Sequence, residues 1–369
     1  MERAELGAWL RLALTPGLGP QSSRRLLAAF GLPQDIFGQS STALQQLLSP
    51  AQAQALQTVP EGWSEQVEAT WAWLQEAPGQ RGVVPLGDTF YPPSLLDIED
   101  PPLLLYLAGR LDLRPDAGRS LAVVGSRNPT PQGALNARHF SQALAEAGLT
   151  IVSGLALGID GAAHEGALAR HADAGLATVA VVGTGLDRVY PKRHHALAHR
   201  ISERGWLVSE YPLGTPPLAA NFPRRNRLIA GLSSATLVVE AALESGSLIT
   251  ARLAAEQGKD VFAIPGSIHA PQARGCHALI RQGAKLVESA QDVLDELPGH
   301  SPLRTRASAV PDDTDPLEQA LGLDPVSLDV LQARTGLDTP ELLARLMTLE
   351  LEGRVARLPG GLLQRLVRG

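Results

Sequence analysis

The spacing of apolar residues predicts helices in the first part of the chain. Leu6, Leu10 and Leu14 recur at helical spacing, residues 16–20 interrupt the period, and the period resumes over residues 26–30. Weaker helical patterns follow up to residue 73, and their three tryptophans are expected in the core. We therefore predict a helical domain over residues 1–76. Its glycine-containing turn fits an ordinary helical corner or a helix-hairpin-helix or SAM-like motif, in which backbone N–H groups approach a phosphate.

Between residues 77 and 297, short apolar runs alternate with amphipathic helical patterns. This alternation predicts an α/β domain in which helices cover a mostly parallel sheet. The runs with strand character are 83–86, 103–107, 121–124, 150–153, 178–182, 206–209, 236–240, 261–264 and 285–287. Ligands of such sheets bind at the carboxyl ends of the strands, so the residues after each strand are candidates for a site.

The composition changes after residue 297. Residues 298–316 contain four prolines among small and charged residues, which is typical of a linker. In residues 317–369, helical patterns at 327–337 and 340–352 precede a predicted β-hairpin at 354–366, and together they predict a winged-helix domain. The second helix carries Glu341, Glu350 and Glu352 against Arg345 alone. That charge set disfavours the major groove, so we expect weak or no binding of duplex DNA.

The overall composition is that of a globular protein with a negative total charge. Apolar residues make up 44% of the chain, charged residues make up 19%, and the net charge is -6. A site for an anionic polymer would therefore need a local concentration of Arg and Lys. The single cysteine, Cys276, excludes an internal disulfide framework. Neither a signal sequence nor an apolar run of about 20 residues is found, so we expect a cytoplasmic protein without a membrane segment.

Small and polar residues stand at or just after the ends of three predicted strands. They are Gly125, Ser126, Arg127, Ser153, Gly154, Leu155, Gly158 and Lys192. Glycines let backbone amides meet a ligand closely, and a helix N-terminus stabilises an anion by about 0.3–1 kcal/mol. Each loop alone also fits a tight turn between a strand and a helix. Taken together, the loops predict an anion site to which Arg127 and Lys192 supply the formal charges.

Residues 221–233 combine an aromatic ring, three arginines and two amides directly before an apolar segment. The polar part reads Asn221, Phe222, Pro223, Arg224, Arg225, Asn226 and Arg227. Guanidinium groups bind phosphate bidentately, and a base stacks on an aromatic ring with about 1–3 kcal/mol. We interpret the stretch as a loop that holds single-stranded nucleic acid without reading its sequence. The alternative is a solvated basic loop that Phe222 anchors in the core.

Other chemistries are less well supported by residue spacing. A dinucleotide site would need Gly-x-Gly-x-x-Gly after the first parallel strand, where this chain has two prolines, and no P-loop pattern is present. His195 and His199 stand four residues apart without an acidic ligand, which favours a solvated helix face over a metal site. Asp160 and His164 have the same spacing and fit either an acid–base pair or an aspartate that caps its helix and bonds the neighbouring histidine. We expect no cofactor and no metal.

Seven segments, in this order, resemble the DNA-processing protein A (DprA) family. They are Val-Val-Gly-Ser-Arg at 123–127, Ser-Gly-Leu-Ala-Leu-Gly-Ile-Asp at 153–160, Gly-Leu-Asp with Tyr-Pro at 185–191, Ser-Glu-Tyr-Pro at 209–212, the arginine-rich stretch at 221–233, Glu-Ser-Gly-Ser-Leu-Ile-Thr-Ala-Arg at 244–252 and Ala-Ile-Pro-Gly at 263–266. The resemblance covers residues 80–290 and implies a Rossmann-like domain. It further implies a non-enzymatic, dimeric protein that binds single-stranded DNA and loads the RecA recombinase during natural transformation.

The resemblance also implies roles for individual residues. Arg127 and Lys192 match DNA contacts of the family, and the arginine-rich stretch at 221–233 matches in full. A departure is His277, which stands where the family usually has Asn after Gly-Cys. The sheet is also similar to that of nucleoside-monophosphate phosphoribohydrolases, which remain the enzymatic alternative. Their Pro-Gly-Gly-x-Gly-Thr loop is missing from the comparable region around Glu240 and Glu244.

Overall fold

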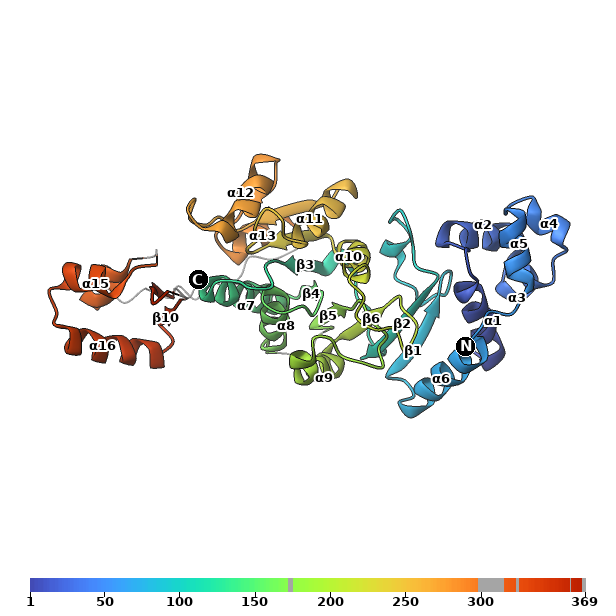
Figure 1. Ribbon diagram of the computed structural model, residues 1–369, viewed down its shortest axis with the longest axis horizontal. Helices are drawn as coiled ribbons and strands as arrows, with labels where there is room; N and C mark the ends of the chain where they lie inside the picture. Colours follow the sequence, from blue (N-terminus) through green and yellow to red (C-terminus); the bar gives the residue numbers. More distant parts are fainter. Residues whose placement is uncertain (172–174, 298–314, 323–324, 359, 367–369) are drawn as a thin grey trace.

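A parallel β-sheet forms the centre of the molecule (Figure 1). The computed structural model describes residues 1–171, 175–297, 315–322, 325–358 and 360–366. Within them, nine strands form one sheet in the order β1-β2-β6-β5-β4-β3-β7-β8-β9. The strands are β1 (Arg81–Pro85), β2 (Leu104–Gly109), β3 (Ser120–Val124), β4 (Thr150–Ser153), β5 (Thr178–Val181), β6 (Trp206–Ser209), β7 (Ala235–Val238), β8 (Asp260–Ala263) and β9 (Lys285–Leu286). Each begins and ends within two residues of the predicted range.

The pairing confirms the predicted α/β class. Strands β3 to β9 pair in parallel, whereas β2 runs antiparallel to both β1 and β6. The strand order reverses at β3, because β4 follows on one side of it and β7 lies on the other. Parallel sheets bind ligands beside such a reversal, so this topology singles out the carboxyl ends of β3 and its neighbours.

Helices cover both faces of the sheet, as expected for a Rossmann-like domain. They are α7 (Pro131–Glu146), α8 (Ile159–Leu168), α9 (His195–Arg204), α10 (Asn221–Gly231), α11 (Ser247–Glu256), α12 (Arg274–Arg281) and α13 (Ala290–Glu296), with short 3-10 helices η1 (Pro93–Leu95), η2 (Ala117–Arg119), η3 (Lys192–His194) and η4 (Pro271–Ala273). Alternate residues of β3 point to opposite faces. Leu121 and Val123 pack with α7, α8 and α13, whereas Ala122 and Val124 pack on the side of α10, α11 and α12.

The N-terminal helices share a core with the antiparallel edge of the sheet. They are α1 (Arg3–Leu14), α2 (Pro20–Phe30), α3 (Pro33–Phe37), α4 (Ser41–Gln45), α5 (Pro50–Gln57) and α6 (Trp63–Glu76). Their buried side chains form one cluster with Val83, Leu104 and Tyr106. Trp73 is buried and meets Tyr106 edge-on at 6.3 Å, which confirms its predicted place in the core. The predicted boundary at residue 76 coincides with the end of α6 and stays a prediction.

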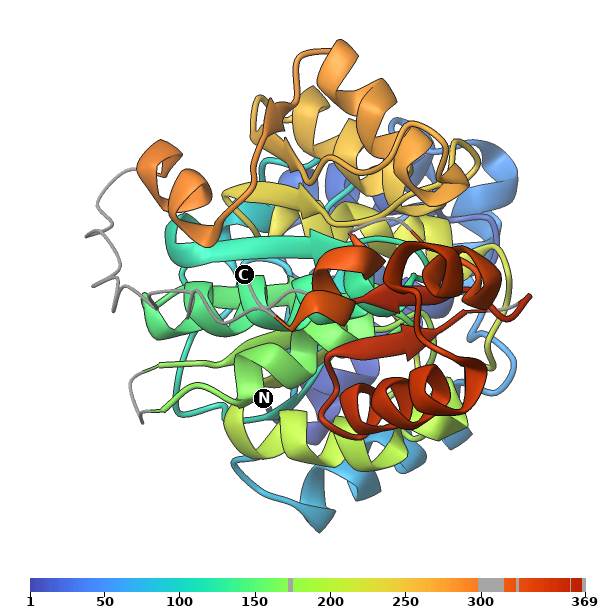
Figure 2. The ribbon, with the colours of Figure 1, turned by 90° about the vertical axis from the view of Figure 1, so that its left-hand side faces the viewer.

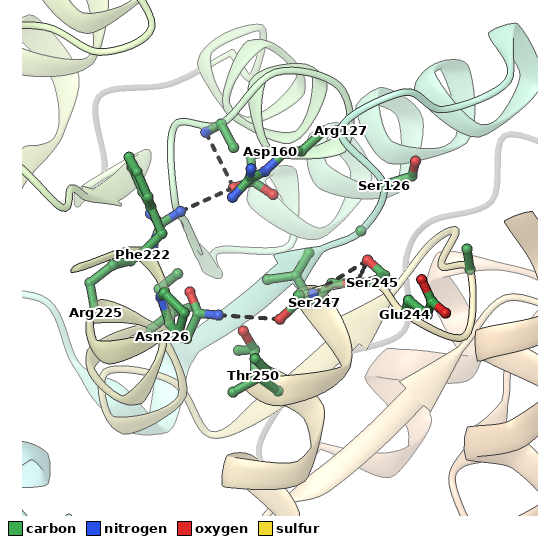
Figure 3. A pocket seen from close by; sticks show the side chains of 18 of the residues that line it. Ser126, Arg127, Asp160, Phe222, Arg225, Asn226, Glu244, Ser245, Ser247 and Thr250 are labelled. Atoms are coloured by element: carbon green, nitrogen blue, oxygen red, sulfur yellow. Dashed lines mark hydrogen bonds and ion pairs between the residues drawn. The ribbon is translucent and has the colours of Figure 1, made fainter. Parts of the chain in front are cut away.

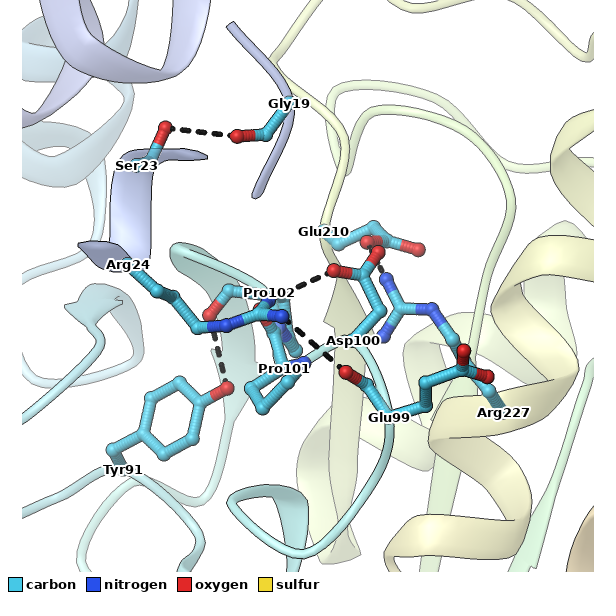
Figure 4. A network of polar contacts seen from close by, with 10 residues as sticks. All are labelled: Gly19, Ser23, Arg24, Tyr91, Glu99, Asp100, Pro101, Pro102, Glu210 and Arg227. Atoms are coloured by element: carbon cyan, nitrogen blue, oxygen red, sulfur yellow. Dashed lines mark hydrogen bonds and ion pairs between the residues drawn. The ribbon is translucent and has the colours of Figure 1, made fainter. Parts of the chain in front are cut away.

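A polar network adds a second tie between the N-terminal helices and the α/β domain (Figure 4). The Arg24 guanidinium on α2 donates to a carboxylate oxygen of Asp100 at 2.8 Å and to the carbonyl of Pro101 at 3.3 Å. The hydroxyl of Tyr91 donates to the carbonyl of Pro102 at 2.9 Å. Since charged hydrogen bonds and a shared core act together, α2 is held firmly against the segment from residue 99 to residue 102.

The C-terminal elements form the predicted winged-helix domain with a core of its own. They are α14 (Pro316–Leu321), α15 (Leu328–Thr335), α16 (Thr339–Leu351), β10 (Val355–Arg357) and β11 (Leu363–Arg365). Strands β10 and β11 pair as an antiparallel hairpin, and Leu331, Leu342 and Leu346 are fully buried beneath it. These elements face the viewer in Figure 2. Most of the predicted linker, residues 298–314, lies outside the described residues.

Candidate functional site

A pocket of about 420 Å³ lies at the carboxyl ends of β3 and β7, beside the reversal of strand order (Figure 3). Helix α10 forms one wall and the start of α11 forms the opposite wall. Of the predicted DNA-binding residues, the pocket brings together Gly125, Ser126, Arg127, Phe222, Arg225 and Asn226. The strand ends and the arginine-rich stretch therefore converge on one site, although they are about a hundred residues apart in sequence.

The arginine-rich stretch is a helix, so the prediction of a loop was wrong. Helix α10 begins at Asn221 and ends at Gly231. Pro223 is tolerated because the N–H groups of a first helical turn need no partner within the helix. Leu228 and Ile229 are buried against the sheet and hold the helix there. At its C-terminal end, the Lys259 ammonium donates to the carbonyls of Ala230 at 2.7 Å and Gly231 at 3.2 Å, where the helix dipole favours a cation.

The three arginines of α10 have different surroundings. Arg224 is exposed. Arg225 is 4% exposed, donates to the carbonyls of Gly154 and Val181, and lies 3.9 Å from the carboxylate of Asp160. Arg227 is largely buried in an ion pair with Glu210. The helix therefore offers Arg224 to solvent, whereas the other two guanidiniums fix α10 to the domain.

The two asparagines of α10 tie it to neighbouring loops. The Asn221 amide donates to the carbonyl of Gly183 after β5 at 3.0 Å, and the Asn226 amide donates to the carbonyl of Gly246 before α11 at 3.3 Å. Both side chains are buried. These bonds fix α10 to the loops at Gly183 and Gly246, and direct DNA contact by the asparagines stays a prediction.

A strip of cations and rings runs from the pocket across the same edge of the sheet. The Arg127 guanidinium lies 5.7 Å from the centre of the half-buried Phe222 ring. The Tyr190 ring also meets Phe222, with 5.6 Å between ring centres, and Tyr190 is 47% exposed. Lys192, which is exposed, follows two residues later. We call the four residues Arg127, Phe222, Tyr190 and Lys192 the edge strip.

Tyr190 was not among the residues predicted to bind DNA. Its signal in the sequence was its place in the loop after the strand at residues 178–182, one residue before Pro191 and two before Lys192. An aromatic residue beside a cation at the ligand-binding edge of a sheet is the same combination that singled out Phe222. What the sequence did not show is that the two rings meet.

The glycine-containing loop after β4 packs against the end of β3 and the loop that follows it. Ser153, Gly154 and Leu155 are buried, and the hydroxyl of Ser153 donates to the carbonyl of Val123 at 2.6 Å. Gly158 has a φ of +81°, and a Cβ at this position would lie 2.4 Å from the carbonyl oxygen of Ser126. These residues therefore shape the loop that carries Ser126 and Arg127, and their predicted direct contact with DNA is untested.

The second wall of the pocket was missed in the sequence. Ser245, Gly246, Ser247 and Thr250 line it at the N-terminus of α11, and the hydroxyls of Ser245 and Ser247 lie 2.7 Å apart. The signal was the run Glu-Ser-Gly-Ser directly before a predicted helix. The N–H groups of Leu248 and Ile249 already donate to the carbonyls of Ser245 and Gly246, so the hydroxyls and the helix dipole are the features of this wall that suit an anion.

The residues considered for acid–base chemistry have structural partners. The Asp160 carboxylate accepts from the backbone N–H of Ala156 at 3.3 Å, and burial raises its pKa although the Arg225 charge opposes that shift. His164 instead meets the Thr178 hydroxyl at 2.7 Å, and burial lowers its pKa to about 3. The Glu240 carboxylate accepts from the backbone N–H of Thr130 at 2.9 Å and so holds the start of α7. Asp160 and His164 therefore bond to different partners, Ala156 and Thr178, and their spacing does not mark an acid–base pair.

The histidines and the cysteine also have structural surroundings. His194 lies 3.0 Å from the carbonyl of Leu155, and the rings of His195 and His199 lie 4.6 Å apart. Within the described residues, no group of three or more potential metal ligands is found. Cys276 is buried, and burial raises the pKa of its thiol to about 12. None of the helices in the described ranges is both long and apolar enough to cross a membrane.

Comparisons with known proteins agree on one family. The sequence profile of DNA recombination-mediator protein A matches residues 82–298, and that of the DprA winged helix domain matches residues 300–361. Protein Smf of Escherichia coli is 42% identical over 327 residues, which cover 85% of this chain and 84% of that protein. DNA processing protein DprA of Streptococcus pneumoniae is 51% identical over 209 residues, which cover 57% of this chain and 72% of that protein.

Two solved structures are similar to this chain. The crystal structure of DNA processing protein A from Streptococcus pneumoniae superposes with a TM-score of 0.64 at 38% identity, covering 80% of this chain and 98% of that chain. DNA processing protein A from Helicobacter pylori, whose single-stranded DNA binding mode has been described structurally, has a TM-score of 0.52 at 31% identity. It covers 58% of this chain and 94% of that chain.

Proposed function

Because this chain belongs to the DNA recombination-mediator protein A family, we propose that it binds single-stranded DNA without sequence preference along the edge strip. The observation that carries the proposal is that the Arg127 guanidinium lies beside the Phe222 ring, that this ring meets the Tyr190 ring, and that the exposed Lys192 follows Tyr190 by two residues. Cations neutralise phosphates, and rings stack on bases of any identity. The strip therefore suits a strand whose bases are unpaired.

The pocket supports the same proposal. Its walls offer Arg127 and the hydroxyls of Ser245, Ser247 and Thr250, next to the start of α11. A phosphate or a base edge could accept from or donate to these groups beside the Phe222 ring. The buried residues Arg225, Asn221 and Asn226 hold α10 in place beside the pocket, because each is bonded to a backbone carbonyl of a neighbouring loop.

The finer proposal concerns the biological role. We infer that the chain acts as a homodimer that protects incoming DNA and loads the RecA recombinase onto it during natural transformation, in the cytosol and without catalysis. The support is the description of the family as a recombination mediator, together with the match along residues 82–298. The position of Glu240 also supports a role without catalysis, because its carboxylate is used to hold the start of α7.

The test is a titration of matched single-stranded and duplex oligonucleotides across a range of salt concentrations. We expect tighter binding of the single strand. In Arg127→Ala and Lys192→Ala the slope of log affinity against log salt should fall by about 0.7 for each phosphate that the variant no longer neutralises. Arg200→Ala is the control, since Arg200 is exposed on α9 but lines neither the pocket nor the strip. Unchanged slopes in both strip variants would remove the edge strip as the binding site.

A further inference from the structure

A groove of about 740 Å³ lies next to the edge strip and shares Lys192 with it, whereas Arg127, Phe222 and Tyr190 lie outside the groove. One wall is the end of α6 with Gln80 and Arg81, from the N-terminal part of the chain. The other wall is α9 with the loop at residues 186–192. Ala108, Gly109 and Leu207 of strands β2 and β6 form the floor. The groove thus lies over the junction between the N-terminal helices and the sheet.

The groove carries a net positive charge. Among the described residues that line it, Arg81, Arg188 and Lys192 are cations and Asp187 is an anion. Arg188 and Asp187 form an exposed ion pair at 2.8 Å, and Arg81 pairs at 2.6 Å with Glu76 outside the lining. Exposed pairs are weak and exchange easily with a phosphate. The field inside the groove therefore favours an anion although the chain as a whole is acidic.

The groove continues the edge strip without a break. Lys192 belongs to both, since it lines the groove and follows Tyr190, whose ring meets Phe222. From Lys192 the wall runs along one side of α9 through His195, His199 and Ser202, which lie three or four residues apart. This wall leads away from the carboxyl edge of the sheet towards Gly109, which is paired with Trp206 at the start of β6.

The walls of the groove are fixed in place. The guanidinium of Arg81 donates to the carbonyl of Trp73 at 2.9 Å, and Trp73 is buried against Tyr106 of β2. Elsewhere along the junction of the N-terminal helices with the sheet, Arg24 is hydrogen-bonded to Asp100 at 2.8 Å. A strand that enters a preformed groove loses less free energy to ordering of the protein than one that must close a flexible site.

We propose that this groove holds further nucleotides of the same DNA strand, so that the N-terminal helical domain forms one wall of an extended binding site. The proposal rests on the proposed function and names where the strand goes after Lys192. Charge complementarity and continuity with the edge strip select DNA over a protein segment. Phosphates would lie near Arg188, Lys192 and Arg81, while bases face the polar side of α9.

The experiment compares two oligothymidylates of about 4 and about 16 nucleotides, which bracket known single-strand site sizes. Gln80→Glu and His199→Glu place a carboxylate on opposite walls, at exposed positions. Each should weaken binding of the longer strand by about fivefold, the effect of two like charges about 4 Å apart in water. Binding of the shorter strand should not change. Gln75→Glu, on the exposed surface of α6 outside the groove, makes the same chemical change and should have no effect.

The possible outcomes separate the two proposals. If both groove variants bind the longer strand as tightly as the unaltered chain, the groove is empty in the complex and the inference is wrong. It is equally wrong if the unaltered chain gains no affinity between the two lengths, or if Gln75→Glu weakens binding as much as Gln80→Glu. The edge strip is tested independently, because Arg127→Ala should weaken binding of the shorter strand whichever result the groove variants give.

Discussion

Arg224 and Arg225 are adjacent in one motif but have different roles, because Arg224 is exposed and Arg225 is buried. A helix turns by about 100° between successive residues, so adjacent side chains leave it in different directions. Arg224 points to solvent, whereas Arg225 points into the domain, where Gly154 leaves the space for its guanidinium. A substitution series that treats all three arginines of the motif as DNA contacts would therefore mix losses of binding with losses of folding.

We expect Arg225→Met to lower the free energy of unfolding by about 3–5 kcal/mol, because it leaves the carboxylate of Asp160 buried without a counter-charge. Arg224→Ala should change it by less than about 0.5 kcal/mol, as is usual for an exposed position. Chemical denaturation of both variants measures the difference. Equal stabilities would show that the buried pair contributes little and that Asp160 is readily neutralised.

Phe222→Leu separates stacking from anchoring. The ring is half-buried and contacts both Arg127 and Tyr190, so a leucine keeps the apolar contact and removes the π-face. We expect the affinity for single-stranded DNA to fall by about 1–3 kcal/mol, with little change in melting temperature. Titration and thermal unfolding of the same sample decide the matter. A lowered melting temperature with normal affinity of the folded fraction would assign Phe222 to the core instead.

At the scale of elements, the strands were predictable and the helix at the site was not. The run 121–124 is continuously apolar and is followed by glycine, and the run 150–153 places two β-branched apolar residues between a threonine and a serine, so local pattern alone located both strands. Helix α10 begins with polar residues and a proline, and its stability comes from burial of Leu228 and Ile229 and from Lys259 at its end. Those contacts lie outside any local window. The contact between Tyr190 and Phe222 could not be predicted for the same reason, since the two residues are distant in sequence.

The loop between β4 and α8 acts on Arg127 through its backbone. The N–H of Ile159 donates to the carbonyl of Ser126 at 3.1 Å, and Gly158 lies close beneath that carbonyl. Gly158→Ala should therefore displace the loop that carries Arg127. We expect a loss of about 1–3 kcal/mol in stability, the usual cost of a strained backbone, together with weaker single-strand binding at temperatures where the variant is folded.

Gly175→Ala is the matched control for Gly158→Ala. Gly175 also has a positive φ, of +76°, but a Cβ there would have no neighbour within 4 Å. The control should lose stability by backbone strain alone and keep its DNA affinity. If both variants retained normal affinity, the contact between Gly158 and Ser126 would matter for folding and not for the position of Arg127.

At the scale of the whole molecule, three arginines of the winged-helix domain form ion pairs with glutamates of the same domain. Arg345 pairs with Glu341 at 2.9 Å, and Arg357 pairs with Glu350 at 2.5 Å. Arg354 pairs with Glu352 at 3.2 Å and with the buried Glu318. These three arginines face four carboxylates, so their surroundings carry no net positive charge that would attract a DNA backbone. This arrangement favours contact with a protein over contact with a duplex.

A chain truncated near Ala309 tests that view. Because the winged-helix elements have their own core, their removal should leave the α/β domain folded. We expect the truncated chain to keep most of its single-strand affinity at physiological salt and to lose at most a modest duplex affinity. Titrations of both lengths with fluorescent oligonucleotides provide the measurement. A loss of more than about tenfold in single-strand affinity, ~1.4 kcal/mol, would place this domain within the main binding site.

The strand order also governs how the chain must fold as it is synthesised. Strand β2 contributes side chains to the N-terminal core and pairs with β1 on one side and β6 on the other. Because Leu107 pairs with Val208, the ladder between β2 and β6 can form only after about a hundred further residues have been synthesised. Strand β3 likewise pairs with β7, which joins Leu121 to Ala235. Such distant pairings fold slowly, and ribosomes add only about 5–20 residues each second. The apolar surface of β2 therefore stays open during much of translation, when nascent chains are most easily captured by chaperones or by one another.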